Sequence, residues 1–159
     1  FGVAAAAAEA ALAALAPPPG RGQIFKRCGM IWIHDCYNAN PEAMAQMLAV
    51  LAATPARRRV AVLGEMRELG AASEARHRQL GAGLATAGVD ALFAVQGDAR
   101  FIVEGARAAS FAGATGFYAD AAAAAVALKP FLRSGDAVLF KASRAVHLED
   151  AIAALDADP

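Results

Sequence analysis

The stretch Trp32–Pro41 reads WIHDCYNANP, and it turns from apolar to polar at Asp35. Trp32 and Ile33 are β-favouring residues that suit a buried strand. Asp35 opens a run of Asp, Tyr and Asn side chains, and Pro41 stands where a helix can begin, because proline is tolerated in the first helical turn. The stretch therefore predicts a strand, a loop rich in hydrogen-bonding groups and a helix in direct succession.

The residues before this stretch predict a hairpin and a separate helix. GQIFKRC (22–28) and MIWIHDC (30–36) are two β-rich runs on either side of Gly29, which is the pattern of a hairpin with a tight turn. Residues 1–16 are rich in alanine and predict a helix, since alanine has the highest helix propensity. PPPG (17–20) ends that helix, because no helix continues through a run of prolines. The chain begins with Phe and not Met, and we expect it to be part of a longer protein.

After Pro41, helix and strand patterns alternate along the chain. The expected helices cover 41–53, 73–88, 99–109, 120–132 and 147–155, and the expected strands cover 57–64, 90–97, 116–119 and 135–143. Ser73 and Gly88 are the predicted N-cap and C-cap of the second helix. Apolar strands separated by helices form a parallel sheet covered on both faces. The predicted fold class is therefore α/β, a Rossmann-like doubly wound, mostly parallel sheet with an antiparallel edge hairpin.

Composition excludes two classes of partner. Lys plus Arg and Asp plus Glu both number 15, so the formal net charge is zero and the basic excess of a nucleic-acid-binding protein is missing. No stretch of about 20 strongly apolar residues is present, so no membrane span is expected. Cys28 and Cys36 have no metal-ligand spacing, and no signal peptide is visible. We expect two reduced thiols in a cytoplasmic protein.

Polar residues follow four of the predicted strands. These polar clusters lie at 35–40, 64–68, 96–100 and 141–144. Because open parallel sheets bind their ligands beyond the carboxyl ends of the strands, the clusters are expected to meet at one rim and to form a ligand site there.

The first cluster allows two interpretations. Asp35 at a strand end is suited to accept hydrogen bonds from a ribose, with Asn38 and Asn40 beside it. The alternative is structural, because Asp and Asn also form turns and caps by bonding to nearby backbone. Three such groups at one strand end, followed by a helical Pro41, favour the ligand interpretation.

Cationic residues flank the predicted rim. Arg21 lies just past the prolines and is placed to meet a phosphate from outside the sheet. Lys141, Ser143 and Arg144 follow the last strand and form a compact group able to bind a carboxylate or a phosphate. For Arg144 the alternative is a solvated charge at the start of the last helix.

Motifs of several other enzyme classes are missing from the sequence. There is no G-x-x-x-x-G-K-[ST] phosphate loop, GAGLATAG (81–88) lies inside a predicted helix, and no nucleophile elbow is present. His77 and His147 have no partners at metal-ligand spacing, so we expect no metal site built by this chain. His77 is expected on a helix face with salt-bridging neighbours, and Trp32 and Phe140 are expected in the core.

Five segments carry a resemblance to a known family. They are GR at 20–21, DCYNANP at 35–41, RRVAVLGEMRELG at 58–70, SEARHRQLG at 73–81 and LFKASRAVHLED at 139–150. In this order and spacing they resemble the C-terminal domain of the Mur ligases, in the branch that adds D-alanyl-D-alanine to UDP-N-acetylmuramoyl-tripeptide (MurF type). The resemblance implies that residues 1–19 are the end of a central ATPase domain with its linker, and that residues 20–159 are the C-terminal domain.

The resemblance implies an ATP-dependent amide ligase of cytoplasmic peptidoglycan precursor synthesis, and hence a role in cell wall formation, cell shape and division. The tripeptide carboxylate would become an acyl phosphate, which the amine of D-alanyl-D-alanine would attack. In the family the preceding domains bind the tripeptide substrate, Mg²⁺ and most of ATP. The implied partners are the two substrates and the protein's own central and N-terminal domains, in a monomer, with no catalytic residue in this chain and little activity from it alone.

The resemblance also implies residue roles. Arg21 would approach the ATP phosphates and Asp35 the ribose, with Tyr37, Asn38 and Asn40 framing the nucleotide. The dipeptide would be received by Glu65, Met66, Lys141, Ser143 and Arg144. Two positions depart from the family pattern, since Cys36 replaces a small residue such as serine, and KASRAV (141–146) replaces KGSRGM.

Two alternatives stay open at this point. Folylpolyglutamate synthase shares the implied architecture and reaction type, but its loop after the strand aspartate contains His-Asn-Pro, unlike CYNANP (36–41). A non-catalytic, flavodoxin-like binding or receiver module would need a second acidic residue beside Asp35 and a phosphoacceptor at the end of a middle strand.

Overall fold

The computed structural model of the chain describes residues 4–13 and 15–157, and its body is one six-stranded sheet. The strands are β1 (Gln23–Arg27), β2 (Met30–Asp35), β3 (Arg58–Gly64), β4 (Ala91–Val95), β5 (Ala114–Tyr118) and β6 (Asp136–Lys141). They lie in the order β1-β2-β6-β3-β4-β5, and every neighbouring pair is parallel except β1 and β2, which are antiparallel. The predicted fold class is confirmed.

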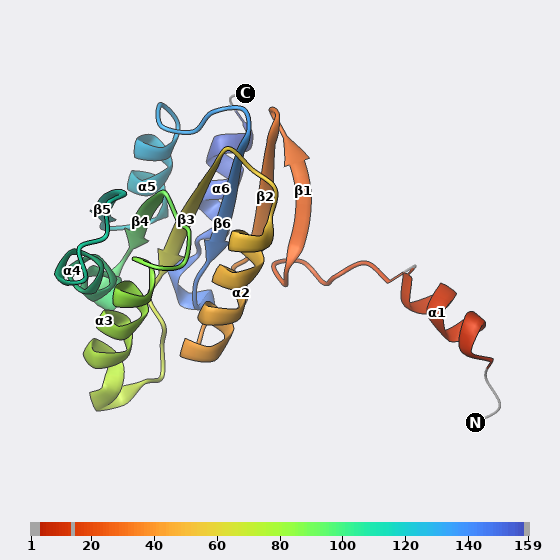
Figure 1. The fold of residues 1–159 in the computed structure, drawn as a ribbon, viewed down its shortest axis with the longest axis horizontal. Coiled ribbons are helices and arrows are strands. Elements are labelled where there is room, and N and C mark those ends of the chain that lie inside the picture. Colours follow the sequence, from red (N-terminus) through yellow and green to blue (C-terminus); the bar gives the residue numbers. More distant parts are fainter. Residues whose placement is uncertain (1–3, 14, 158–159) are drawn as a thin grey trace.

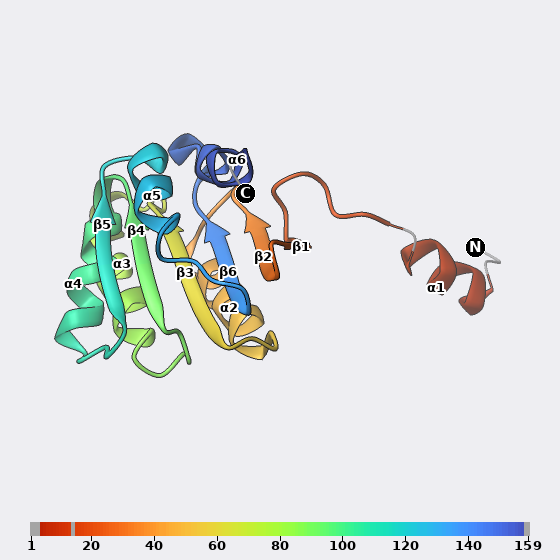
Figure 2. The ribbon, with the colours of Figure 1, turned by 90° about the horizontal axis from the view of Figure 1, so that it is seen from above.

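Helices cover both faces of the sheet. The helices on the sheet are α2 (Pro41–Ala53), α3 (Ser73–Gly83), α4 (Arg100–Ala108), α5 (Ala121–Leu128) and α6 (Glu149–Asp156), with short 3₁₀ turns at Gly70–Ala72, Gly97–Ala99 and Arg144–Val146. A further helix, α1 (Ala5–Ala13), covers neither face (Figure 1). Figure 2 shows α5 and α6 on one face and α2, α3 and α4 on the other. The sheet is therefore doubly wound, as expected.

The core has two halves, one under each helix layer. In β6, which is buried along its whole length, Val138 and Phe140 face α5 and α6, while Ala137 and Leu139 face the other layer. The rings of Trp32 and Phe140 pack with their centroids 5.4 Å apart. Their predicted place in the core is confirmed. Burial on both faces explains why these strands read as continuous apolar runs.

The edge hairpin forms where the sequence predicts it. Gly29, with φ at +72°, makes the tight turn between β1 and β2 together with Cys28 at φ +47°. Ahead of the hairpin, α1 lies away from the sheet (Figure 1), and its described side chains are exposed. The predicted helix over 1–16 is thus shorter, although residues 1–3 and 14 lie outside the described residues.

The expected helix over 73–88 begins at Ser73 as predicted, but the predicted cap was wrong and the helix ends earlier. Ser73 is not the N-cap, because the 3₁₀ turn Gly70–Ala72 leads straight into the helix and leaves Ser73 with helical dihedrals. The helix ends at Gly83, and the chain then tightens into i→i+3 turns from Leu84 to Ala87. Glycine at the end of the helix favours this change because of its low helix propensity. Gly88 follows these turns, with φ at +66°.

Smaller differences concern strand and helix ends. β5 begins at Ala114, before the expected 116–119, and α5 and α6 are shorter than expected. Asp120 caps α5 through its carboxylate, which accepts a hydrogen bond from the Ala123 N–H at 2.8 Å. Among the described helices, none is long and apolar enough to cross a membrane.

Candidate functional site

The winding of the sheet creates a crevice at the carboxyl end of β6. The loop after β2 leads to α2 on one face, whereas the loop after β6, its neighbour, leads to α6 on the other face. Loops that part in this way form the crevice where open α/β sheets bind ligands. Asp35 and Lys141 are paired at the ends of β2 and β6 and lie in this position.

Asp35 and Lys141 form the polar centre of this rim. The Lys141 Nζ donates to Asp35 Oδ2 at 2.5 Å and to the Asn38 carbonyl at 2.9 Å, and the lysine is only 2% exposed. The other carboxylate oxygen, Oδ1, accepts a hydrogen bond from the Gly22 N–H at 3.0 Å. Asp35 therefore neutralises a buried ammonium and also holds the segment that leads into β1. An ionised carboxylate has about four acceptor sites, so it can still accept a bond from a ligand.

Two guanidinium groups lie around Tyr37. The Arg21 guanidinium is 3.9 Å from the centre of the tyrosine ring, and that of Arg144 is 5.7 Å from it. Tyr37 is 43% exposed, and its backbone N–H donates to the Gly20 carbonyl at 3.1 Å. Within the described residues, neither arginine has a carboxylate partner. Two exposed cations held by one ring, without counter-ions, form a surface suited to anionic ligands.

Asn38 and Asn40 use their side-chain oxygens locally. Asn40 Oδ1 caps α2 by accepting from the Ala43 N–H at 2.8 Å, and Asn38 Oδ1 accepts from the Ala39 N–H at the same distance. The structural interpretation, in which these side chains bond to nearby backbone, therefore applies to both oxygens. Both residues are exposed, so a contact with a ligand would fall on their side-chain NH₂ groups.

The loop after β3 meets the loop after β6 through Ser143. The Ser143 Oγ accepts from the Arg67 N–H at 2.9 Å, and the Ser143 N–H donates to the Glu65 carbonyl at 3.2 Å. The Glu65 carboxylate pairs with Arg67 at 2.9 Å and accepts from the Asp98 N–H at 3.2 Å. Met66 is 1% exposed and packs in the core, so it contributes only its backbone to the rim.

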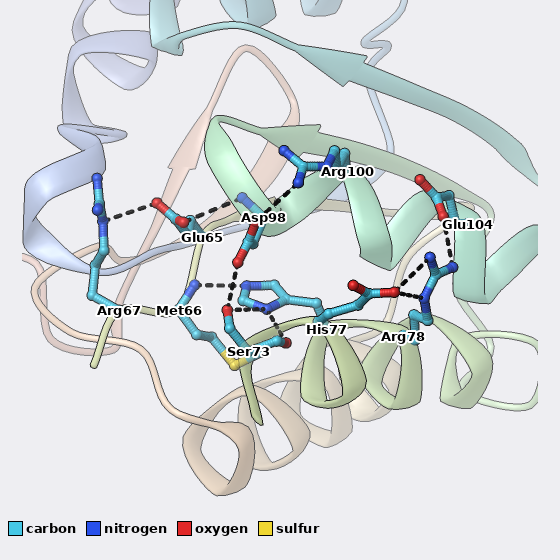
Figure 3. A network of polar contacts seen from close by, with 10 residues as sticks. Glu65, Met66, Arg67, Ser73, His77, Arg78, Asp98, Arg100 and Glu104 are labelled. Carbon is cyan, nitrogen blue, oxygen red and sulfur yellow. Dashed lines mark hydrogen bonds and ion pairs between the residues drawn. The ribbon is translucent and has the colours of Figure 1, made fainter. Parts of the chain in front are cut away.

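A buried histidine completes this network (Figure 3). His77 is 0% exposed, so the expectation that it lies on a helix face among salt-bridging residues was wrong for the ring. Its neighbour Arg78 does make such ion pairs, with Glu74 and Glu104. His77 and Gly81 lie four residues apart and are the buried residues of α3. The His77 ring points to the loop after β3, and Gly81 packs against α4.

Comparison with known proteins identifies the family. A sequence model described as "Mur ligase, glutamate ligase domain" matches residues 20–144. The chain belongs to the Mur ligase family. A curated relative from Synechocystis sp., named UDP-N-acetylmuramoyl-tripeptide--D-alanyl-D-alanine ligase, is 35% identical over 89% of this chain and 31% of its own length. The chain spans about a third of the length of the curated relatives it matches.

Solved structures agree with this identification. The crystal structure of MurF ligase from Thermotoga maritima in complex with ADP has a TM-score of 0.77 and 30% identity, over 92% of this chain and 33% of that one. A crystal structure of MurF from Acinetobacter baumannii has a TM-score of 0.88 and 28% identity, over 99% of this chain and 35% of that one. The resemblance to the Mur ligase C-terminal domain is confirmed.

This Mur ligase domain accommodates its two departures from the family pattern. Ala142 is buried opposite Gly64, where an added Cβ would stand 2.5 Å from the Ala142 Cβ, so the glycine provides the space. Cys36 is also buried, and burial raises the pKa of its thiol. Its sulfur donates to the Phe140 carbonyl at 3.4 Å, and both Cys36 and Cys28 are free thiols, as predicted.

Proposed function

We propose that the full-length protein is the ATP-dependent ligase that joins D-alanyl-D-alanine to UDP-N-acetylmuramoyl-tripeptide in cytoplasmic peptidoglycan precursor synthesis. Residues 20–159 would be its C-terminal domain, and residues 1–19 the end of the central ATPase domain with its linker. The names of the relatives support this proposal, as does the position of α1 away from the sheet. The protein would act as a monomer, together with its own central and N-terminal domains.

One observation carries the proposal, namely the two guanidinium groups around Tyr37, which have no carboxylate partner within the described residues. The reaction brings together two anionic ligands, a nucleoside triphosphate and a dipeptide with a free carboxylate. Desolvating a carboxylate without a cationic partner is expensive, so a domain that delivers such ligands needs cations at its ligand edge. Arg21 and Arg144 lie at that edge.

The proposed chemistry is amide formation through an acyl phosphate. An oxygen of the terminal tripeptide carboxylate attacks the γ-phosphorus of ATP and releases ADP. The neutral amine of D-alanyl-D-alanine then adds to the acyl carbon, and the tetrahedral intermediate expels inorganic phosphate while the nitrogen loses its proton. Catalysis of this kind rests on positioning and on neutralising charge, and the residues of this domain would supply both.

The proposed roles of the rim residues follow their positions. Arg21, Asp35, Tyr37, Asn38 and Asn40 would contact ATP, and Glu65, Met66, Lys141, Ser143 and Arg144 would receive the dipeptide. Met66 would act through its backbone, because its side chain is buried. Lys141 would join the two groups, because its ammonium is bonded to Asp35.

Mg²⁺, which the family implies beside ATP, is assigned to other parts of the full-length protein in this proposal. Residues 4–13 and 15–157 contain no group of three His, Cys, Asp or Glu side chains that could hold a metal ion. In the proposal the preceding domain and the ATP phosphates bind it, and no step on this chain is assigned to it.

A product assay tests the proposed function. Purified full-length protein is incubated with ATP, UDP-N-acetylmuramoyl-tripeptide and either D-alanyl-D-alanine or glutamate, and the products are identified by mass spectrometry. We expect the amide of D-alanyl-D-alanine and none of glutamate. A glutamate adduct, or ATP consumption without any amide product, would refute the proposal.

A further inference from the structure

The loop after β3 is held from the side of α3 by a single buried ring. His77 accepts a hydrogen bond at Nε2 from the Met66 N–H at 2.9 Å, and its Nδ1 lies 2.8 Å from the Ser73 carbonyl (Figure 3). A backbone N–H only donates and a carbonyl only accepts. The ring must therefore carry its proton on Nδ1 and present a lone pair at Nε2. His77 thus satisfies the buried Met66 amide.

The same loop is held from its other side by Ser143. Arg67, the residue after Met66, donates its N–H to the Ser143 hydroxyl, and Glu65, the residue before it, accepts from the Ser143 N–H. Residues 65–67 are thus bonded to α3 on one side and to the β6–α6 loop on the other. Residues 65–67 therefore connect the His77 ring to Ser143 and to the adjacent Arg144.

A second set of contacts fixes the place of the ring. The Ser73 hydroxyl, 3.4 Å from Nδ1, donates to Asp98 Oδ2 at 2.7 Å, and the Asp98 N–H donates to Glu65. Figure 3 shows how these contacts close a circuit from the β3–α3 loop through α3 and the turn after β4. The ring is therefore part of the network that shapes the rim, although it is too deeply buried to touch a ligand.

We propose that His77 is a positioning residue of the ligase. It sets the backbone of residues 65–67 so that Ser143 and Arg144 are placed for the amine substrate. This inference rests on the proposed function and deepens it, because it assigns to one buried residue the geometry of the dipeptide side of the rim. His77 acts through Met66 and Ser143.

The test compares four proteins in the full-length ligase: the wild type, His77→Leu, His77→Gln and Leu84→Ala. Leucine fills the space without an acceptor, whereas glutamine offers both an acceptor and a donor. Leu84 is buried just after α3, so its truncation destabilises the same region without removing a hydrogen bond to residues 65–67. Initial rates are measured with ATP and D-alanyl-D-alanine varied in turn, and hydrogen exchange is measured for peptides that cover residues 65–69.

In His77→Leu we expect the KM for D-alanyl-D-alanine to rise about tenfold, the equivalent of one lost hydrogen bond, with the KM for ATP changed less than about twofold. In His77→Gln the KM for D-alanyl-D-alanine should rise less than in His77→Leu. In Leu84→Ala the KM for D-alanyl-D-alanine should not rise more than the KM for ATP. Exchange at 65–69 should accelerate in His77→Leu only. The inference would be overturned if His77→Leu changed both KM values equally, or if its KM values matched those of Leu84→Ala.

The exchange measurement separates this inference from the proposed function. If the wild type forms no amide of D-alanyl-D-alanine, the proposed function fails, but exchange still reports whether His77 holds the loop. Unchanged exchange at 65–69 in His77→Leu would overturn the positioning role whatever the substrate of the enzyme.

Discussion

Asp35 holds two parts of the molecule at once. Its carboxylate pairs with the buried Lys141 ammonium and accepts the Gly22 N–H from the segment before β1. A buried ion pair adds little to stability when it is compared with apolar residues of similar volume, but removing one partner strands the other charge. The main role of the pair is therefore to connect the linker, β2 and β6, and its net contribution to stability is small.

A comparison of a single and a double variant tests this link. Asp35→Ala should lower the free energy of unfolding by about 3–5 kcal/mol, because it leaves Lys141 buried and unpaired. Asp35→Ala combined with Lys141→Met should be less destabilised than Asp35→Ala alone, as measured by urea denaturation. A double variant that is less stable than Asp35→Ala would show that the stranded charge is not the cause.

The same substitution also reports on ATP. In the full-length enzyme, Asp35→Ala should impair the use of ATP by about ten- to hundredfold, the effect of losing charge-assisted hydrogen bonds to a ribose. The double variant with Lys141→Met should keep this loss, since it recovers part of the stability but not the acceptor. Unchanged ATP kinetics in both variants would return Asp35 to a purely structural role.

Arg144 and Arg21 can be compared to test which part of the rim binds the dipeptide and which part binds ATP. A guanidinium binds a carboxylate with two parallel hydrogen bonds, which an ammonium does not reproduce. Arg144→Lys should therefore raise the KM for D-alanyl-D-alanine several-fold and leave that for ATP nearly unchanged, whereas Arg21→Lys should do the reverse. Initial rates with each substrate varied in turn decide between them, and an Arg144 effect confined to ATP would move this residue to the nucleotide group.

The site could be predicted from the sequence as far as local chemistry determines it. Asp35, Tyr37, Lys141 and Arg144 were expected at one rim because strand ends converge there, and the structure brings them together. What the sequence did not reveal was pairing across strands. The Asp35–Lys141 contact joins residues 106 positions apart in the chain. His77 was missed because its charged neighbours suggest a solvated helix, although its spacing from Gly81 agrees with a buried face.

At the level of elements, the sequence predicted those helices and strands whose local pattern agrees with their packing in the fold. The hairpin, the buried strands and α2 agree with expectation because glycine at the turn, apolar runs and the Pro41 start all favour the same structure. The end of α3 did not follow from its sequence. Gly81 and Gly83 both weaken the helix, but only packing against α4 explains why Gly81 is glycine.

The two glycines of α3 make a matched stability test. A Cβ at Gly81 would collide with the backbone of Ile102 and Ala106 in α4, which cannot move away cheaply, whereas a Cβ at Gly83 would meet nothing within 4 Å. Gly81→Ala should lower the free energy of unfolding by about 1–3 kcal/mol. Gly83→Ala should leave it unchanged or raise it by about 0.5 kcal/mol, because alanine is the better helix former. Urea denaturation measures both, and a tolerated Gly81→Ala would contradict the close packing of α3 on α4.

For the whole molecule, the proposed function makes the rim at the carboxyl end of the sheet one side of a larger site. The chain has no phosphate loop to grip the β- and γ-phosphates, and it spans about a third of the length of its relatives. We therefore expect the isolated chain to fold but to release no phosphate from ATP and to bind ATP weakly. Circular dichroism and a phosphate-release assay check this, and ATP-dependent phosphate release by the purified chain would contradict it.

The proposed function depends on the transfer of a phosphoryl group to the tripeptide carboxylate, and oxygen-18 follows that transfer directly. The terminal carboxylate of UDP-N-acetylmuramoyl-tripeptide is labelled, and the full-length enzyme is supplied with ATP and D-alanyl-D-alanine. Attack of the carboxylate on the γ-phosphorus, followed by expulsion of phosphate, places one labelled oxygen in each inorganic phosphate formed with the amide. Mass spectrometry of the phosphate should show this label in step with product. Amide formation with unlabelled phosphate would contradict the acyl phosphate and the function built on it.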